Sequence, residues 1–343
     1  MRRHSQLSVL LMGGLLAGGL ASSPARAQSV EEFYKGKTIN FIIGYSPGGG
    51  YDIWARLVAR HIGNHIPGKP QVVPRNMPGA SSRAAAASMF AVQPKDGTAL
   101  ATGDQSLSLA QAMGENIQFD TTKFIYIGNP NAENNTTAAW HTTGIKTIED
   151  VKQKELPVGA TGGSTSSQYP RVMNALLGTK FKIVLGYPGG NDINLAMERG
   201  EVGGRGSNSW ASWKATKPDW IRDKKINILV QIGLSKVPDL PDVPLLMDLG
   251  ANEEDRTLLK LLSAPVTIGR PIWTTPDVPA DRVKALRDAF QATLKDPAFL
   301  DEAQKSGLEV NAVSGEEMQK IVADIVATPK PIAQRLGQLI EEK

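Results

Sequence analysis

Hydrophobic and polar positions along the chain follow strand and helix periods in turn. Residues 38–43 form an apolar, β-rich run that predicts a strand, and the glycine-rich segment 46–50 ends it. In 54–62 the apolar positions recur at helical spacing, which predicts a helix that ends before Gly63 and Pro67. Further β-rich runs predict strands at 72–73, 99–101, 124–127, 158–160, 183–185 and 226–230, with helices between many of them.

The C-terminal part of the chain is helical in pattern. Apolar stripes at 283–294 and 318–325 predict two helices, and Ser314 with Glu317 is typical of a capping box before the second. Repeated strand–helix alternation predicts an α/β fold with largely parallel sheets. Such sheets bind ligands at the carboxyl ends of strands, which is where the glycine-rich loops of this chain lie.

The N-terminus predicts export. Arg2 and Arg3 precede an apolar stretch at 7–20, and Ala25-Arg26-Ala27 is typical of a signal-peptidase site. The stretch is interrupted by glycines and short of the roughly 20 residues that span a bilayer, so a retained membrane anchor is the weaker alternative. We predict a signal peptide at 1–27, cleaved after Ala27, and a periplasmic product; whether export uses the general or the twin-arginine route stays open.

Charge and cysteine content restrict the partners. Loss of Arg2, Arg3 and Arg26 leaves 35 basic and 34 acidic residues, a net charge of about +1, and no long basic run follows. Nucleic acid is therefore not an expected partner. The chain has no cysteine, which excludes disulfides, thiol catalysis and a lipid-anchored N-terminal cysteine. We expect no cofactor, a monomer, and two lobes, because single cores stop growing near 250–300 residues.

The loop after the first predicted strand is the first candidate for ligand binding. Three glycines let backbone N–H groups approach a ligand, and the helix N-terminus that follows favours an anion. In the alternative interpretation the loop is a plain turn with Asp52 as a cap or first-turn acid, and that carboxylate would repel a ligand placed too near it. The residues of this loop are Tyr45, Ser46, Pro47, Gly48, Gly49, Gly50, Tyr51 and Asp52.

Three later segments are further candidates, each with the alternative of a solvated loop. A Gly/Ser-rich segment follows the strand predicted at 158–160, and its residues are Thr161, Gly162, Gly163, Ser164, Thr165 and Ser166. Tyr187 and Gly189 belong to the segment 187–192. Arg205 and Asn208 belong to a loop predicted at 205–210, where the guanidinium suits a bidentate carboxylate contact unless it is a surface arginine.

A serine hydrolase is the alternative from another class. Gly44 to Gly48 matches G-x-S-x-G with Ser46 as nucleophile, placed between a strand and a helix. The residue after the serine is Pro47, which has no N–H for an oxyanion hole. His61, His65 and His141 are the histidines outside the signal peptide, and no metal-binding spacing occurs. We therefore expect no catalytic residues and no metal site.

Four motifs in order resemble the Bug/TctC family, the extracytoplasmic receptors of tripartite tricarboxylate transporters. The resemblance covers the chain from Gly36 to the C-terminus and departs from the family pattern at Tyr187-Pro188-Gly189, where the family often has a lysine in place of the proline. The motifs are Phe41-Ile42-Ile43 with Ser46-Pro47-Gly48-Gly49-Gly50-Tyr51-Asp52 and Ala55-Arg56; Arg75-Asn76-Met77-Pro78-Gly79-Ala80; Pro94-Lys95-Asp96-Gly97-Thr98-Ala99-Leu100; and Leu240-Pro241-Asp242-Val243-Pro244.

The resemblance implies a type II periplasmic-binding-protein fold, two α/β lobes with a ligand cleft between them. Lobe 1 would hold 28–127 and 235–343, and lobe 2 would hold 128–234. It further implies a non-enzymatic receptor that passes a small carboxylate to a membrane permease, with the ligand held by the loops at 46–52 and 161–166. A sensory protein for a membrane kinase would use the same cleft. Tyr187 and Trp210 favour an aromatic or longer acid if they line the cleft, and not if they pack in the lobe core; a dicarboxylate is the other expectation.

Overall fold

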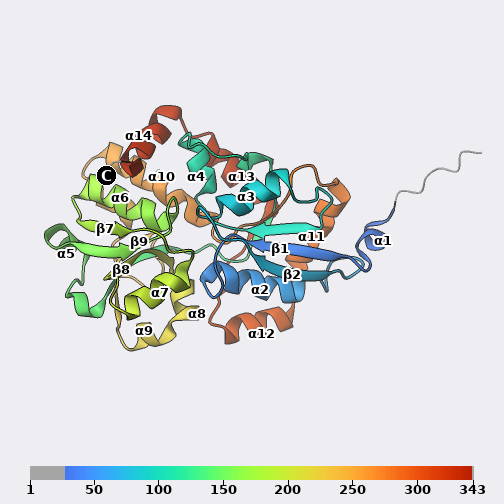
Figure 1. Ribbon diagram of the computed structural model, residues 1–343, viewed down its shortest axis with the longest axis horizontal. Helices are drawn as coiled ribbons and strands as arrows, with labels where there is room; N and C mark the ends of the chain where they lie inside the picture. The colour runs from blue at the N-terminus through green and yellow to red at the C-terminus, as the bar shows by residue number, and fades with distance from the viewer. Residues whose placement is uncertain (1–27, 342–343) are drawn as a thin grey trace, which may run out of the picture.

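Two separate β-sheets, each covered by helices, make up the protein (Figure 1). The structure is a computed structural model and describes residues 28–341. The predicted signal peptide lies outside the described residues. Within 28–341 no helix is long and apolar enough to cross a membrane.

The first sheet has six strands in the order β11-β4-β10-β3-β1-β2. β1 pairs in parallel with both β2 and β3, whereas β10 runs antiparallel between β3 and β4. We call this sheet and its helices the first lobe. Its strands are β1 (Thr38–Ile43), β2 (Gln71–Asn76), β3 (Ala99–Thr102), β4 (Ile125–Asn129), β10 (Ile272–Thr274) and β11 (Val313–Ser314).

The second sheet has five strands in the order β7-β6-β8-β5-β9, and with its helices it forms the second lobe. β6 is parallel to β7 and β8, whereas β5 is antiparallel to β8 and β9. The strands are β5 (Asn135–Trp140), β6 (Leu156–Gly159), β7 (Phe181–Val184), β8 (Gly204–Ser209) and β9 (Ile226–Ile232).

The prediction of largely parallel sheets was wrong, because both sheets are mixed. β5 enters the second sheet just after the chain leaves the first, and β10 returns to the first sheet after the chain leaves the second. Each returning strand arrives from the other lobe and runs against its neighbours. The chain passes between the sheets after β4 and after β9; the exact lobe boundaries at 127/128 and 234/235 remain a proposal.

The seven predicted strand runs overlap strands of the structure, but the segment 205–210 was wrongly predicted as a loop. It contains most of β8, which lies inside the second sheet. Glycine and serine lack the bulky alternation that marks a strand, yet the packing here requires small residues. A Cβ on Gly206 would lie 2.0 Å from the carbonyl oxygen of Ser166, on the helix that covers this strand.

Helices cover both sheets, and the two predicted C-terminal helices are present as α11 and α13. Ser314 caps α13, its Oγ accepting from the N–H of Glu317 at 3.2 Å, but the return bond from the Ser314 N–H to the Glu317 side chain that completes a capping box is not formed. The helices up to α7 are α1 (Val30–Tyr34), α2 (Gly50–Ile62), α3 (Arg83–Ala91), α4 (Leu107–Ala112), α5 (Ile148–Gln153), α6 (Thr165–Leu177) and α7 (Gly190–Glu198). The others are α8 (Trp210–Thr216), α9 (Pro218–Arg222), α10 (Glu253–Ser263), α11 (Ala280–Thr293), α12 (Pro297–Lys305), α13 (Gly315–Val326) and α14 (Lys330–Glu341).

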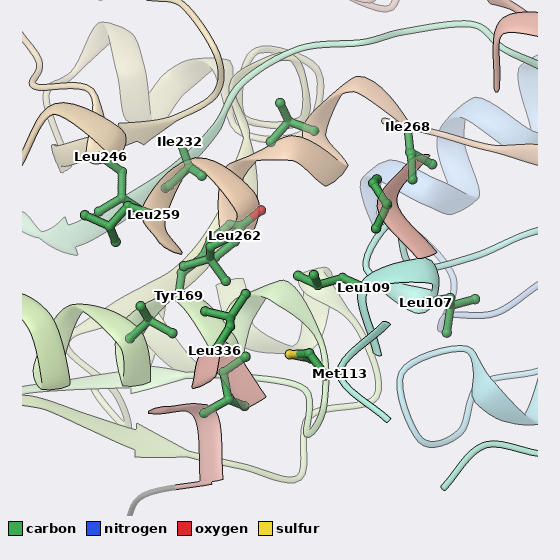
Figure 2. Close-up of a cluster of buried hydrophobic side chains, with 14 of the residues drawn as sticks. Leu107, Leu109, Met113, Tyr169, Ile232, Leu246, Leu259, Leu262, Ile268 and Leu336 are labelled. Atoms are coloured by element: carbon green, nitrogen blue, oxygen red, sulfur yellow. The ribbon is translucent and has the colours of Figure 1, made fainter. Parts of the chain in front are cut away.

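One hydrophobic core runs through the junction of the lobes (Figure 2). It joins Leu109 of α4 in the first lobe to Tyr169 of α6 in the second. Leu262 of α10 and Leu336 of α14 pack into the same cluster, and both are fully buried. Helices α10 and α14 therefore hold the two lobes together.

Candidate functional site

A cavity lies between the two lobes, and both contribute to its wall. Among the helices that begin at or beside it are α2 of the first lobe, and α6 and α7 of the second. Each follows a loop at the carboxyl end of a strand. Their N-terminal N–H groups and dipoles make the cavity favourable for negative charge. The cavity volume is about 50 Å³.

Ten of the residues predicted from the sequence lie on the cavity wall. They come from all but one of the four predicted segments, so segments far apart in the chain meet at one place. These residues are Tyr45, Gly49, Gly50, Tyr51, Thr161, Ser164, Thr165, Ser166, Arg205 and Asn208.

The other predicted residues lie beside the cavity, where they make hydrogen bonds and packing contacts with other residues of the protein. Gly162 accepts a hydrogen bond from Ser81, and Gly189 lies against Ser46. Tyr187 packs against the hydrophobic cluster of the second lobe that contains Trp210, Trp213 and Trp220. The Nε1–H of Trp210 donates to Asp239 at 2.7 Å. The predicted residues off the wall are Ser46, Pro47, Gly48, Asp52, Gly162, Gly163, Tyr187 and Gly189.

Asp52 does not oppose an anion in the cavity, because its charge is satisfied elsewhere. Its carboxylate accepts from the Gly48 N–H at 2.9 Å, pairs with Arg56 at 2.9 Å and accepts from Asn76 at 2.8 Å. Burial alone would raise the pKa of Asp52, but these hydrogen bonds outweigh it and lower the pKa. Asp52 thus shapes the loop and stays ionised away from the ligand space.

Two arginines, one from each lobe, lie in the cavity wall without a carboxylate partner. Among the described residues, no Asp or Glu oxygen lies within 4.0 Å of either guanidinium. Arg205 donates from Nε to the Ser207 carbonyl at 2.9 Å and from Nη1 to Asn194 at 3.0 Å, which leaves Nη2 available. Burial, and after it the charge of Arg270, lowers the pKa of Arg205.

Arg270 approaches from the first lobe and bridges to the second. Its Nη2 donates to the hydroxyls of Ser209 and Ser212, both at 2.7 Å. Its guanidinium carbon lies 4.3 Å from the centre of the Tyr51 ring, and its side chain is buried. The remaining N–H groups of this guanidinium are donors without a carboxylate.

Asn208 supplies a third donor. Its side chain is 5 % exposed, and Nδ2 is buried without a hydrogen-bond partner among the described residues. An unpaired buried donor costs about 1–3 kcal/mol, which a ligand oxygen would recover. Together with the arginines, Asn208 gives the cavity several donors that the protein itself does not use.

Eight residues of the wall were not named from the sequence, although Gly190, Ser207 and Ser209 among them lie within the candidate segments 187–192 and 205–210. Asp104 and Gln105 follow the strand predicted at 99–101, so the rule that ligands bind at strand ends would have found them. Nothing in the sequence marks Arg270, which reaches the cavity from the segment before the returning strand β10. The missed residues are Asp104, Gln105, Asn135, Gly190, Ile193, Ser207, Ser209 and Arg270.

The lobes touch each other beside the cavity. Ser46 of the first lobe donates to Asp192 of the second at 2.6 Å. A Cβ on Gly49 would lie 3.6 Å from the backbone nitrogen of Gly190, so the two loops approach at backbone distance. This is the arrangement expected of two lobes closed around a ligand.

The contacts of Ser46 do not form a hydrolase site. Its hydroxyl bonds to a carboxylate, whereas His61 and His65 pair with Glu302 and Asp296 at 2.7 and 3.0 Å. No histidine of the described residues is positioned as its general base. Residues 28–341 also contain no group of three or more His, Asp or Glu that could hold a metal ion.

Comparison with known proteins agrees with this architecture. A curated protein of Cupriavidus necator, "UPF0065 protein in gbd 5'region", is 26% identical over 98% of both chains. The structure of periplasmic binding protein BugD matches with a TM-score of 0.71 at 21% identity, covering 89% of this chain and 98% of BugD. R. palustris Rpa4515 with adipate matches with a TM-score of 0.67 at 20% identity, covering 88% of this chain and 97% of that one.

The fold is therefore that of the two-lobed periplasmic binding proteins. The sequence model described as "Tripartite tricarboxylate transporter family receptor" matches residues 55–338, which include most of both lobes. These residues include the starts of α6 and α7, the two arginines and Asn208, whereas the loop before α2 precedes the matched range. The chain belongs to the family of tripartite tricarboxylate transporter receptors, TctC, and is a solute-binding protein rather than an enzyme.

Proposed function

We propose that this protein captures a small carboxylate between its lobes in the periplasm and delivers it to the membrane permease of a tripartite tricarboxylate-type transporter. The observation that carries the proposal is the set of unused donors around the cavity: Arg205 and Arg270 without carboxylate partners, and Asn208 Nδ2 without any partner. A carboxylate accepts such donors in charge-assisted hydrogen bonds. The adipate in R. palustris Rpa4515 gives the same ligand class in a similar fold.

The size of the cavity favours a compact acid, and the two rings that suggested an aromatic ligand do not line it. Trp210 and Tyr187 pack in the core of the second lobe and not on the cavity wall, and Ile193 is the one aliphatic side chain among the wall residues. The cavity volume of about 50 Å³ is a few times the roughly 10–15 Å³ that encloses one water. An acid of a few carbon atoms suits this space.

A thermal-shift screen of refolded, ligand-stripped protein tests the proposal. The panel contains mono-, di- and tricarboxylates, aromatic acids and the neutral amide of each acid. A ligand at 100 times its dissociation constant stabilises the folded protein by about 2.7 kcal/mol. We expect a short acid to raise the melting temperature while its amide does not; stabilisation by neutral compounds alone would refute carboxylate capture.

A further inference from the structure

One wall residue has the wrong charge for a site that binds only an anion. Asp104 lies in the loop after β3, is 3 % exposed, and shares the cavity wall with both arginines. No basic side chain of the described residues lies within 4.0 Å of its carboxylate. A buried, unpaired carboxylate is costly and repels a bound acid, so its presence in this wall requires a reason.

The hydrogen bonds of Asp104 hold its carboxylate in place and leave one acceptor position open. Oδ1 accepts from the N–H and the hydroxyl of Ser106, at 2.8 and 2.5 Å. Oδ2 accepts from the hydroxyl of Tyr45, whose ring stacks on Tyr51 with centres 4.8 Å apart. A carboxylate offers about four acceptor positions, and these three bonds leave one on Oδ2.

The cavity therefore offers two kinds of contact at once. Arg205, Arg270 and Asn208 present donors that suit carboxylate oxygens, whereas Asp104 presents an acceptor that suits a donor. A plain acid satisfies the first group only and leaves Asp104 desolvated. An acid that also carries a hydroxyl or ammonium group satisfies both.

We propose that Asp104 is a specificity-determining residue, and that the ligand is a short carboxylic acid bearing a hydroxyl or ammonium group whose hydrogen Asp104 accepts. The inference rests on the proposed function and narrows it to hydroxy or amino acids of this size. Hydroxyl and ammonium share the required chemistry as donors, and the experiment separates them.

Titration calorimetry with matched acids tests the role of Asp104. Malate and aspartate are each compared with succinate, and lactate with propionate, on refolded, ligand-stripped protein. We expect at least one donor-bearing acid to bind 10-fold or more tightly than its plain partner; tighter binding of malate identifies a hydroxyl, and tighter binding of aspartate an ammonium. Equal or tighter binding of the plain acids overturns the proposal while carboxylate capture stands, whereas failure of every acid to bind refutes both.

Asp104→Asn separates recognition from a purely structural role, because an asparagine oxygen can still accept from Ser106. We expect the preference for the donor-bearing acid to fall to within about 3-fold, while the plain acid binds as well as before or better. Asp120→Asn is the matched control, since Asp120 Oδ1 accepts from the N–H and hydroxyl of Thr122 at 3.0 and 2.6 Å away from the cavity. An unchanged preference in Asp104→Asn would overturn the assignment.

Discussion

Asn208 allows binding and stability to be separated at a single residue. Asn208→Leu keeps the approximate size but removes the unpartnered Nδ2 donor. We expect the affinity for the bound acid to fall by about 10–100-fold, because a hydrogen bond to a charged group contributes about 1.5–3 kcal/mol. The free energy of unfolding without ligand should stay the same or rise, since an unsatisfied buried donor is lost. Calorimetry and urea unfolding measure the two quantities.

The exposed Asn64, just after α2, provides the control variant Asn64→Leu, which should change neither affinity nor ligand-free stability. If Asn208→Leu lowers affinity and stability together, its role is structural. If it lowers neither, Nδ2 does not contact the ligand.

The sequence predicted wall residues that lie in loops between a strand and a helix. It missed wall residues whose position depends on how distant segments pack together. Gly49 and Thr161 follow strands and precede helices, so their place at a ligand-binding edge follows from local pattern. Arg270 reaches the cavity only because β10 returns from the other lobe beside β3. Trp210 belongs to the predicted segment 205–210, but its side chain does not line the cavity, because its indole turns to Asp239 and the lobe core.

At the scale of elements, β8 and α14 contain glycines with opposite expected responses to alanine. Gly206→Ala places a Cβ 2.0 Å from the Ser166 carbonyl oxygen, so α6 and β8 must separate, and we expect a loss of about 1–3 kcal/mol in the free energy of unfolding. Gly337→Ala adds a Cβ at ordinary contact distance, 3.5 Å from Met113, within a helix, and should gain about 0.5–1 kcal/mol.

Urea unfolding of both variants checks this pair under identical conditions. A destabilising Gly337→Ala would show that α14 does not tolerate added volume against α4. If Gly206→Ala leaves the free energy of unfolding unchanged, β8 and α6 can move apart without cost, contrary to the close approach at Gly206.

The sequence predicted the elements that carry an apolar pattern of their own and missed β8, which does not. Strands such as 38–43 carry their own apolar signal, because a β-branched run is buried on both faces of a sheet. β8 is specified by what packs against it, and its small residues look like a loop when read alone. The mixed strand directions likewise follow from the path of the chain between lobes, which no local window contains.

At the scale of the whole molecule, closure of the lobes should contribute to affinity apart from ligand contacts. Ser46 does not lie on the cavity wall, yet its hydroxyl donates to Asp192 of the other lobe at 2.6 Å. A protein that populates its closed form less often binds its ligand more weakly in proportion. Contacts that join the lobes are therefore part of the binding energy even when they never touch the ligand.

Ser46→Ala tests this coupling, and we expect the affinity for the bound acid to fall about 3–10-fold, the effect of losing one hydrogen bond of about 0.5–1.5 kcal/mol. Small-angle scattering should show a larger radius of gyration without ligand and the wild-type value at saturation. Ser88→Ala is the control, because the Ser88 hydroxyl bonds to Gln93 within the first lobe. If Ser46→Ala matches the wild type in both measurements, the lobes close through their backbone contacts and Arg270 without help from this hydroxyl.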